Sequence, residues 1–137
     1  MNLYRSILLT ICTFALTLAS CGDDYIENGI EGRWQLRQVT SADGQVANVD
    51  TVFYSFKKKV FEYRQLDTPT QPSGCFGTYN LTDDILEIKL DNESYFPDNQ
   101  EPYLDWDGLT RTYRVIKQTS SKIELEYAGC TFSFRKY

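Results

Sequence analysis

The sequence predicts an all-β fold, and three features of its 137 residues carry that prediction. The chain contains 10 Tyr, 8 Phe and 2 Trp, and aromatic side chains favour strands. From residue 33 onward, short segments alternate apolar and polar residues between turn residues, and no segment sustains the helical period of 3.6. A hydrophobic fraction of 42% with a charged fraction of 24% indicates a folded chain, and the length fits one domain.

Eight segments have the alternation of half-buried strands. The period is clearest near the C-terminus, where Ile123, Leu125 and Tyr127 share one face and charged residues fill the other. The predicted strands are 33–39, 52–56, 60–65, 74–81, 85–90, 110–117, 121–127 and 130–136. Antiparallel strands joined in sequence order bury their apolar faces most simply by closing into an up-and-down barrel, which also removes exposed edges. A β-sandwich is the alternative.

The connections between these strands differ in length according to the end of the barrel they occupy. Connections 40–51, 66–73 and 91–109 are long and fall at one end, because strand direction alternates. Connections 57–59, 82–84 and 118–120 are tight and fall at the other. We therefore expect one elaborated mouth and one closed end. The chain enters its first strand at the closed end, so any N-terminal tether leaves from there.

The first twenty residues predict a signal peptide. Arg5 precedes twelve mostly apolar residues, 7–18, which suit a signal-peptide core and are too few to span a bilayer. The following Leu18-Ala19-Ser20-Cys21 resembles the lipobox of bacterial lipoproteins, with an ordinary secretory signal as the alternative. The resemblance implies cleavage before Cys21 and acylation of its thiol, and two or three acyl chains anchor a protein stably.

The residues after Cys21 bear on location. Gly22 does not match the common inner-membrane retention signal, and Asp23-Asp24 resembles the surface-export signal of Bacteroidetes lipoproteins. We expect an outer-membrane lipoprotein exposed at the surface, with a periplasm-facing orientation as the alternative. The chain then divides into a signal peptide at 1–20, an acylated tether at 21–31 and a barrel domain at 32–137.

Composition excludes several function classes. The chain has no histidine, so Ser-His-Asp and Cys-His catalysis and His-ligated zinc are ruled out. Without histidine a nucleophile needs lysine or a carboxylate as its base, and no spacing marks such a pair. A net charge of -5 argues against binding to nucleic acid. We expect neither an enzyme nor a cofactor or metal site.

A three-residue motif opens the first strand. Gly32-Arg33-Trp34 resembles the Gly-X-Trp signature of the lipocalin and wider calycin group. The resemblance implies that Trp34 plugs the closed end and that a basic side chain near the end of the last strand stacks across it. Arg135 has that place, with Lys136 as the substitute. Together with the lipobox, the motif is similar to the small lipocalin-like lipoproteins of Bacteroidetes. The chain departs from the group in having no helix after its last strand and a short mature length.

The alternation also predicts the barrel interior. The inward side chains are Trp34, Leu36, Tyr54, Phe56, Phe61, Tyr63, Tyr79, Leu86, Ile88, Tyr113, Val115, Ile123, Leu125, Tyr127, Phe132 and Phe134. An eight-stranded barrel is either filled by its side chains or holds one small ligand, and both readings stay open. The interior tyrosines are ligand-binding candidates because each hydroxyl needs a partner.

Arg111 is the charged candidate for ligand binding. It shares parity with Tyr113, which places it inward near the mouth, where a guanidinium could bind a ligand carboxylate as a bidentate pair. The alternatives are a register slip that turns Arg111 outward, or an internal pairing with a loop carboxylate.

The 91–109 connection combines six acids with four aromatic residues and contains no base. Loops of this length are often functional. We expect Tyr95, Phe96, Tyr103 and Trp106 either to contact a ligand, a protein partner or a sugar, or to pack over the barrel mouth. The ligand spacing of a calcium loop is absent.

Cys75 and Cys130 remain in the mature chain besides Cys21, and each opens a strand that descends from the mouth. Outside the cytoplasm oxidation favours a disulfide between them. The alternative is two free thiols on opposite walls of the barrel.

The leading functional prediction is a lipid-anchored, lipocalin-like protein that binds a small hydrophobic or amphipathic ligand through its mouth. The second is an interaction module, in which a filled barrel serves as an inhibitor or an accessory subunit in the outer membrane. The third is glycan binding by the 91–109 loop.

Overall fold

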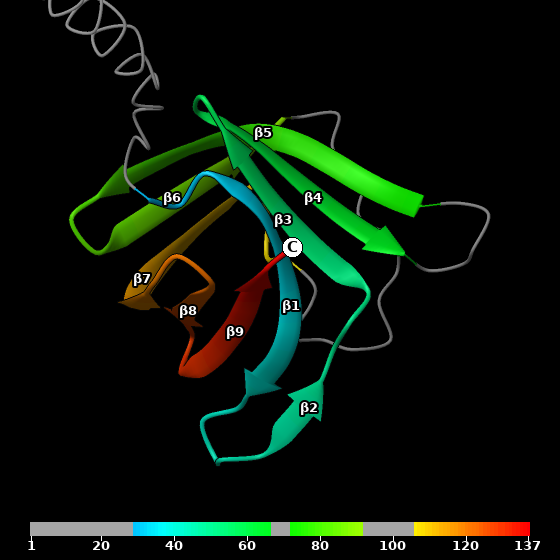
Figure 1. Ribbon diagram of the computed structural model, residues 1–137, viewed down its shortest axis with the longest axis vertical. Helices are drawn as coiled ribbons and strands as arrows, with labels where there is room; N and C mark the ends of the chain where they lie inside the picture. Colours follow the sequence, from blue (N-terminus) through cyan, green and yellow to red (C-terminus); the bar gives the residue numbers. More distant parts are fainter. Residues whose placement is uncertain (1–28, 67–71, 92–105) are drawn as a thin grey trace, which may run out of the picture.

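The computed structural model describes residues 29–66, 72–91 and 106–137, and every regular element within these ranges is a strand (Figure 1). The strands are β1 (Gly32–Thr40), β2 (Val46–Asn48), β3 (Val52–Lys57), β4 (Val60–Leu66), β5 (Pro72–Thr82), β6 (Ile85–Leu90), β7 (Thr110–Gln118), β8 (Lys122–Tyr127) and β9 (Cys130–Lys136). The described residues contain no helix long and apolar enough to cross a membrane.

Eight of these strands close into an antiparallel barrel. β1 and β3 to β9 pair in sequence order, and β9 pairs back onto β1. The predicted up-and-down barrel is confirmed, and the alternative of a β-sandwich is wrong. β2 was not predicted: its three residues lie within the 40–51 connection and pair with the end of β1. A strand this short carries too little alternation to be recognised in the sequence.

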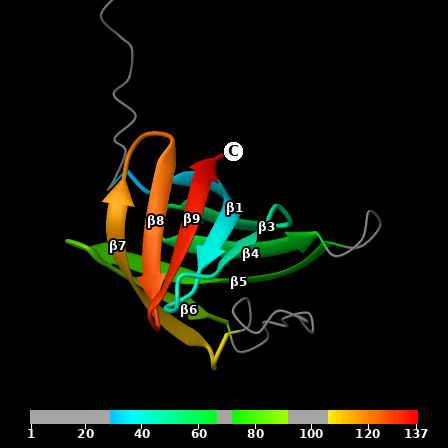
Figure 2. The same cartoon turned by 90° about the horizontal axis from the view of Figure 1, so that it is seen from below.

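The connections sort to two ends, as predicted. Figure 2 shows the entry to β1, the β7–β8 turn and the C-terminus at one end, and the β8–β9 turn and the start of β7 at the other. We call the first the closed end, comprising residues 29–32, the turns 58–59, 83–84 and 119–121, and Tyr137. We call the second the mouth, comprising residues 41–51, 91, 106–109 and the turn 128–129. At the closed end the Tyr137 amide donates to the Arg33 carbonyl at 2.8 Å.

Aromatic rings fill much of the barrel. Tyr54 is 3% exposed and its ring centroid lies 4.9–6.4 Å from those of Phe56, Phe61, Tyr63, Tyr113 and Phe134. The predicted inward residues are buried, except for Val115 and Tyr127, which are half-buried and pack against the core. A register shift between Val115 and Lys117 interrupts the alternation of β7 at this point.

One buried ring lies on the outer face of the barrel. Phe53 is buried although its neighbours Val52 and Tyr54 already occupy the other face of β3. The ring of Tyr137 packs edge-on against it at 5.1 Å, and the Arg33 guanidinium lies 4.6 Å from its centroid. The C-terminal residue and the signature arginine therefore cover β3 from outside.

Candidate functional site

The Gly-X-Trp motif forms the corner where the last strand meets the first. Trp34 is fully buried, and its Nε1 donates to the Ile30 carbonyl at 2.7 Å. The Lys136 Nζ lies 4.5 Å from the Trp34 ring centroid. Lys136 faces Trp34 directly in the β1–β9 ladder, so both side chains project from the same face.

The expectation that Arg135 stacks on Trp34 is wrong. Arg135 is paired with Gln35 in the ladder, and its Nε donates to Gln35 Oε1 at 3.1 Å. Adjacent residues of a strand point to opposite faces, so only one of the two basic residues can reach the tryptophan. The substitute, Lys136, occupies that place, and its parity with Phe132 and Phe134 already indicated this in the sequence.

The glycine of the motif leaves room for the lysine. A Cβ on Gly32 would lie 2.3 Å from Lys136 Nζ and 2.6 Å from its Cε, and the φ of Gly32 is +123°. The Lys136 ammonium also donates to the Glu31 carbonyl oxygen. Burial lowers the pKa of Lys136, and the charge of Glu31 partly offsets that effect. The Lys136 ammonium thus contacts both the Trp34 ring and the Glu31 backbone oxygen.

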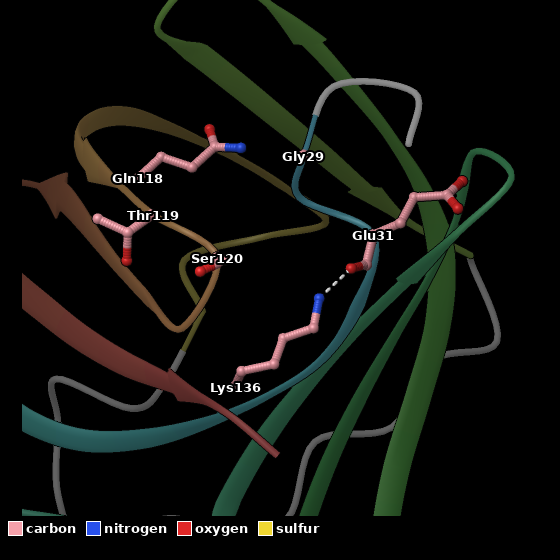
Figure 3. A pocket seen from close by; sticks show the side chains of 6 residues that line it. All are labelled: Gly29, Glu31, Gln118, Thr119, Ser120 and Lys136. Carbon is pink, nitrogen blue, oxygen red and sulfur yellow. Dashed lines mark hydrogen bonds between the residues drawn. The ribbon is translucent and has the colours of Figure 1, made fainter. Parts of the chain in front are cut away.

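A groove lies outside this corner at the closed end (Figure 3). Its volume is about 720 Å³, and it is lined by Gly29, Glu31, Gln118, Thr119, Ser120 and Lys136. In Figure 3 the Glu31 carboxylate points away from Lys136, and it accepts a hydrogen bond from the Lys58 amide at 2.8 Å. All of these residues except Gly29 have polar or charged side chains, and the groove lies at the end opposite the predicted ligand mouth.

Arg111 lies inside the barrel near the mouth. It is the second residue of β7 and only 4% exposed, so the alternative of an outward Arg111 is wrong. Its Nη1 donates to the Tyr113 hydroxyl at 3.3 Å, and that hydroxyl lies 2.9 Å from the Tyr54 hydroxyl. Two buried phenol groups and a guanidinium therefore form one polar chain within an aromatic interior.

Aromatic rings flank the guanidinium. The Arg111 Cζ lies 4.4 Å from the Tyr127 ring centroid and 4.8 Å from that of Trp106. Trp106 is half-buried and packs against Phe61, with 6.0 Å between ring centroids. The structure thus brings together Tyr54, Arg111, Tyr113, Tyr127 and Trp106, which we call the mouth cluster. The other aromatic candidates of the 91–109 loop, Tyr95, Phe96 and Tyr103, lie outside the described residues.

The pKa values of Arg111, Tyr113 and Tyr54 in the mouth cluster depend on one another. Burial alone would lower the pKa of Arg111, but Tyr113 and Tyr54 outweigh it and raise that pKa. Burial raises the pKa of Tyr113 and raises that of Tyr54 well above its ordinary value, against the opposing effect of Arg111. At neutral pH the cluster therefore presents one positive charge beside two neutral hydroxyls. All three groups can donate hydrogen bonds to an anion.

Comparison with known proteins decides the family. Residues 16–137 match the family described as a lipocalin-like domain. This chain belongs to the lipocalin-like family. No functionally curated protein matches it.

Two solved structures are similar to this lipocalin-like chain. A lipocalin-like protein from Bacteroides uniformis ATCC 8492 is 36% identical with a TM-score of 0.72, covering 80% of this chain and 99% of that one. An uncharacterized protein from Bacteroides eggerthii DSM 20697 is 31% identical with a TM-score of 0.68, covering 78% of this chain and 98% of that one. The predicted resemblance to a lipocalin-like Bacteroidetes protein is thereby confirmed.

The remaining interior tyrosines of the lipocalin-like barrel have local partners. The Tyr63 hydroxyl donates to Gln65 Oε1 at 2.6 Å, and the Tyr79 ring packs edge-on against Phe56 at 5.0 Å. Gln65 is buried and was not predicted as an interior residue. Because it shares parity with Phe61 and Tyr63, the alternation of β4 could have identified it.

The two cysteines of the lipocalin-like domain are free thiols. Cys75 is buried and Cys130 is half-buried, and no disulfide joins them. The predicted disulfide is not formed, because β5 and β9 stand on opposite walls of the barrel, separated by β6, β7 and β8. Burial raises the pKa of the Cys75 thiol to about 12. Within the described ranges, no three His, Cys, Asp or Glu residues form a metal-binding group.

Proposed function

We propose that this lipocalin-like domain binds a small amphipathic molecule with an anionic head, and that the head contacts Arg111. The observation that carries the proposal is that Arg111 is only 4% exposed and that its guanidinium lies 4.8 Å from the Trp106 ring centroid and 4.4 Å from that of Tyr127. A guanidinium binds a carboxylate or phosphate through two parallel hydrogen bonds, and the rings offer an apolar surface for the rest of the ligand.

The length of the hydrogen bond from Arg111 to Tyr113 favours its exchange for a bond to such a ligand. The bond from Arg111 Nη1 to the Tyr113 hydroxyl is 3.3 Å, longer than the usual range for N–H···O bonds. Bonds between a guanidinium and a carboxylate are shorter and roughly twice as strong as neutral ones. A carboxylate at this position would also accept from Tyr113 or Tyr54, which share one hydrogen bond.

Binding is tested by calorimetry with saturated fatty acids and the primary alcohols of the same chain lengths. We expect the wild-type protein to bind acids more tightly than alcohols. Arg111→Gln should weaken acid binding by about 10- to 100-fold, the value of hydrogen bonds to a charged group, and leave alcohol binding unchanged. Arg114→Gln is the matched control, because Arg114 lies on the same strand with an exposed side chain. Equal losses in both variants, or no binding of any chain length, would reject the proposal.

We also propose that the domain is held at the outer membrane, facing outward, by acyl chains on Cys21. The support is the lipobox-like Leu18-Ala19-Ser20-Cys21 and the acidic pair that follows. Mass spectrometry of the membrane-extracted protein should show cleavage before Cys21 and an acylated N-terminal peptide, both absent from Cys21→Ser. Digestion of intact cells with a protease tests the orientation, because an outward domain is degraded and a periplasmic one is protected.

A second candidate function is a protein-interaction module, which the ring-filled interior favours. Tyr54 touches five rings at 4.9–6.4 Å, which leaves little space in the middle of the barrel for a bulky ligand. In that case neither acids nor alcohols would bind, and crosslinking in intact cells would join the domain to a specific outer-membrane protein.

A further inference from the structure

The distribution of charge along the barrel axis suggests a second binding surface. In the described connections at the mouth, the charged residues are all acidic and exposed: Asp43, Asp50, Asp91 and Asp107. At the closed end, exposed basic residues occupy the β3–β4 hairpin, both sides of the β7–β8 turn and the end of β9. They are Lys57, Lys58, Lys59, Lys117, Lys122, Arg135 and Lys136. We propose that this basic closed end docks on the phosphate headgroups of an anionic membrane.

The basic groups converge where the N-terminal tether leaves the barrel. The Lys58 amide donates to Glu31 Oε1 at 2.8 Å, and the Lys136 ammonium donates to the Glu31 carbonyl. The Lys136 amide donates to the Ser121 carbonyl at 2.8 Å, which joins β9 to the β7–β8 turn. Figures 2 and 3 show the β7–β8 turn, the end of β9 and the entry to β1 close together. The face therefore surrounds residues 29–31.

Acidic residues at the same end are fewer than the basic ones. Glu31 lies at the centre, and Asp83 and Asp84 form the β5–β6 turn. Glu124 forms an ion pair with Lys122 at 2.7 Å. Among the described side chains at the closed end, the balance of charge is positive although the whole chain carries -5.

The backbone of the β3–β4 hairpin is strained at two of the lysines. Lys58 and Lys59 have φ angles of 48° and 69°. A two-residue turn with both φ angles positive favours Asn-Gly, so lysine at both positions costs conformational energy. Asp83 and Ala128 have similar φ angles in other turns of the barrel, but at the β3–β4 hairpin the residues that bear the strain carry two exposed positive charges.

Exposed apolar side chains lie among these cations. Val60 is 52% exposed beside the lysine hairpin, Ile116 is 42% exposed beside Lys117, and the C-terminal Tyr137 is 67% exposed. Long basic side chains beside apolar and tyrosine side chains are typical of surfaces that lie in the headgroup region. An anionic bilayer therefore fits this face better than a soluble acidic partner does.

The proposal rests on the proposed acylation of Cys21, which would hold the basic face near a membrane. Eight residue steps separate Cys21 from Gly29, and covalent geometry limits their span to about 28 Å. The tether is thus short enough to keep the closed end close to the lipid surface. A single acyl chain plus a polybasic patch already gives stable attachment, so the face adds to the anchor.

The test uses the full mature chain, residues 21–137, with Cys21→Ser so that acyl chains do not dominate. Sedimentation with vesicles of phosphatidylcholine and phosphatidylglycerol should capture the protein at low salt. Vesicles of phosphatidylcholine alone should not, and added salt should release it. Lys58→Asn with Lys59→Gly should weaken capture by roughly 25-fold, from about fivefold per lysine near an anionic surface.

The same double variant excludes unfolding as the cause of weaker capture. Asn-Gly suits the turn, so the thermal midpoint should rise while vesicle binding falls. The matched control is Arg64→Gln with Lys89→Gln, which removes two charges from the outer wall nearer the mouth and should change capture less than threefold. Equal losses in the two double variants, or equal capture by neutral vesicles, would overturn the proposal. Acylation of the wild-type chain is measured separately by mass spectrometry. Acylation without vesicle capture rejects only the proposed docking of the basic closed end. Capture without acylation rejects only the proposed lipid anchor.

Discussion

Lys136 Nζ lies 4.5 Å from the centroid of the Trp34 ring, at the point where the last strand of the barrel closes onto the first. One side chain thereby joins two ends of the chain that are about a hundred residues apart, since its ammonium also binds the Glu31 carbonyl. The contact links the Gly-X-Trp motif to the closure of the barrel, and its contribution to the free energy of unfolding can be measured.

Lys136→Met should lower the free energy of unfolding by about 1–2 kcal/mol, because it removes a cation–π contact and a hydrogen bond to Glu31. Arg135→Met should cost less than about 1 kcal/mol, because its bond to Gln35 lies on the partly exposed outer face. Urea unfolding of both variants checks this, with Lys136→Arg as the variant that keeps the charge. Equal losses for Lys136→Met and Arg135→Met would contradict the assignment of Lys136.

Gly32→Ala should destabilise the domain by about 1–3 kcal/mol, because the position combines a φ of +123° with close approach of Lys136. Gly44→Ala is the matched control. Its φ is +86°, but no atom lies within 4 Å of the Cβ position. Gly32→Ala should therefore cost more than Gly44→Ala in chemical unfolding, and an equal or smaller loss would contradict a contribution from the close approach of Lys136.

Cys75 should make stability fall above pH 9. Burial raises the pKa of its thiol from 9.0 to about 12, so the folded protein holds this proton where the unfolded chain releases it. The contribution of the protonated Cys75 thiol to the free energy of unfolding is complete below pH 9. It is lost as pH rises towards 12, at up to about 1.4 kcal/mol per pH unit. Unfolding measured between pH 8 and pH 10 should show a steeper decline for the wild type than for Cys75→Ala. Parallel declines would mean that the thiol ionises normally in the fold.

Tyr54→Phe should cost about 1 kcal/mol, because Tyr113 loses one partner but still accepts from Arg111. Tyr113→Phe should cost about 2–3 kcal/mol, because it leaves both Arg111 and Tyr54 without that hydroxyl in a buried site. A double-mutant cycle on the two tyrosines, read by chemical unfolding, gives their coupling. Additive losses would indicate that the 2.9 Å bond contributes nothing net.

The alternation of apolar and polar residues along the strands predicted most of the fold and part of the candidate site. The inward position of Arg111 follows from its parity with Tyr113, and the structure places it there. The same rule applied to Phe132 and Phe134 identifies Lys136, whereas choosing the basic residue by position along the chain gives Arg135. The period-two pattern was thus more informative than the motif spacing.

Other features depend on which distant segments meet, and the pattern of one strand cannot show that. Phe53 is buried on the outer face because Tyr137 and Arg33 lie over it. The predicted disulfide was wrong for a similar reason: Cys75 and Cys130 lie on strands that both start at the mouth but stand on opposite walls of the barrel. Neither the burial of a strand's outer face nor the distance between two walls of a barrel can be predicted without knowing how the sheet closes.

The hydrogen bond between Tyr137 and Arg33 places the C-terminus beside the entry to the barrel. A fluorescent protein fused after Tyr137 would stand at the closed end, beside residues 29–32 where the chain enters the barrel. An epitope inserted in the turn at 41–45 would stand at the far end of the barrel, away from the closed end. Because Arg33 and Tyr137 both lie at the closed end, a linker could also join the two ends of the described barrel, and the chain could be reopened at that distal turn as a circular permutant.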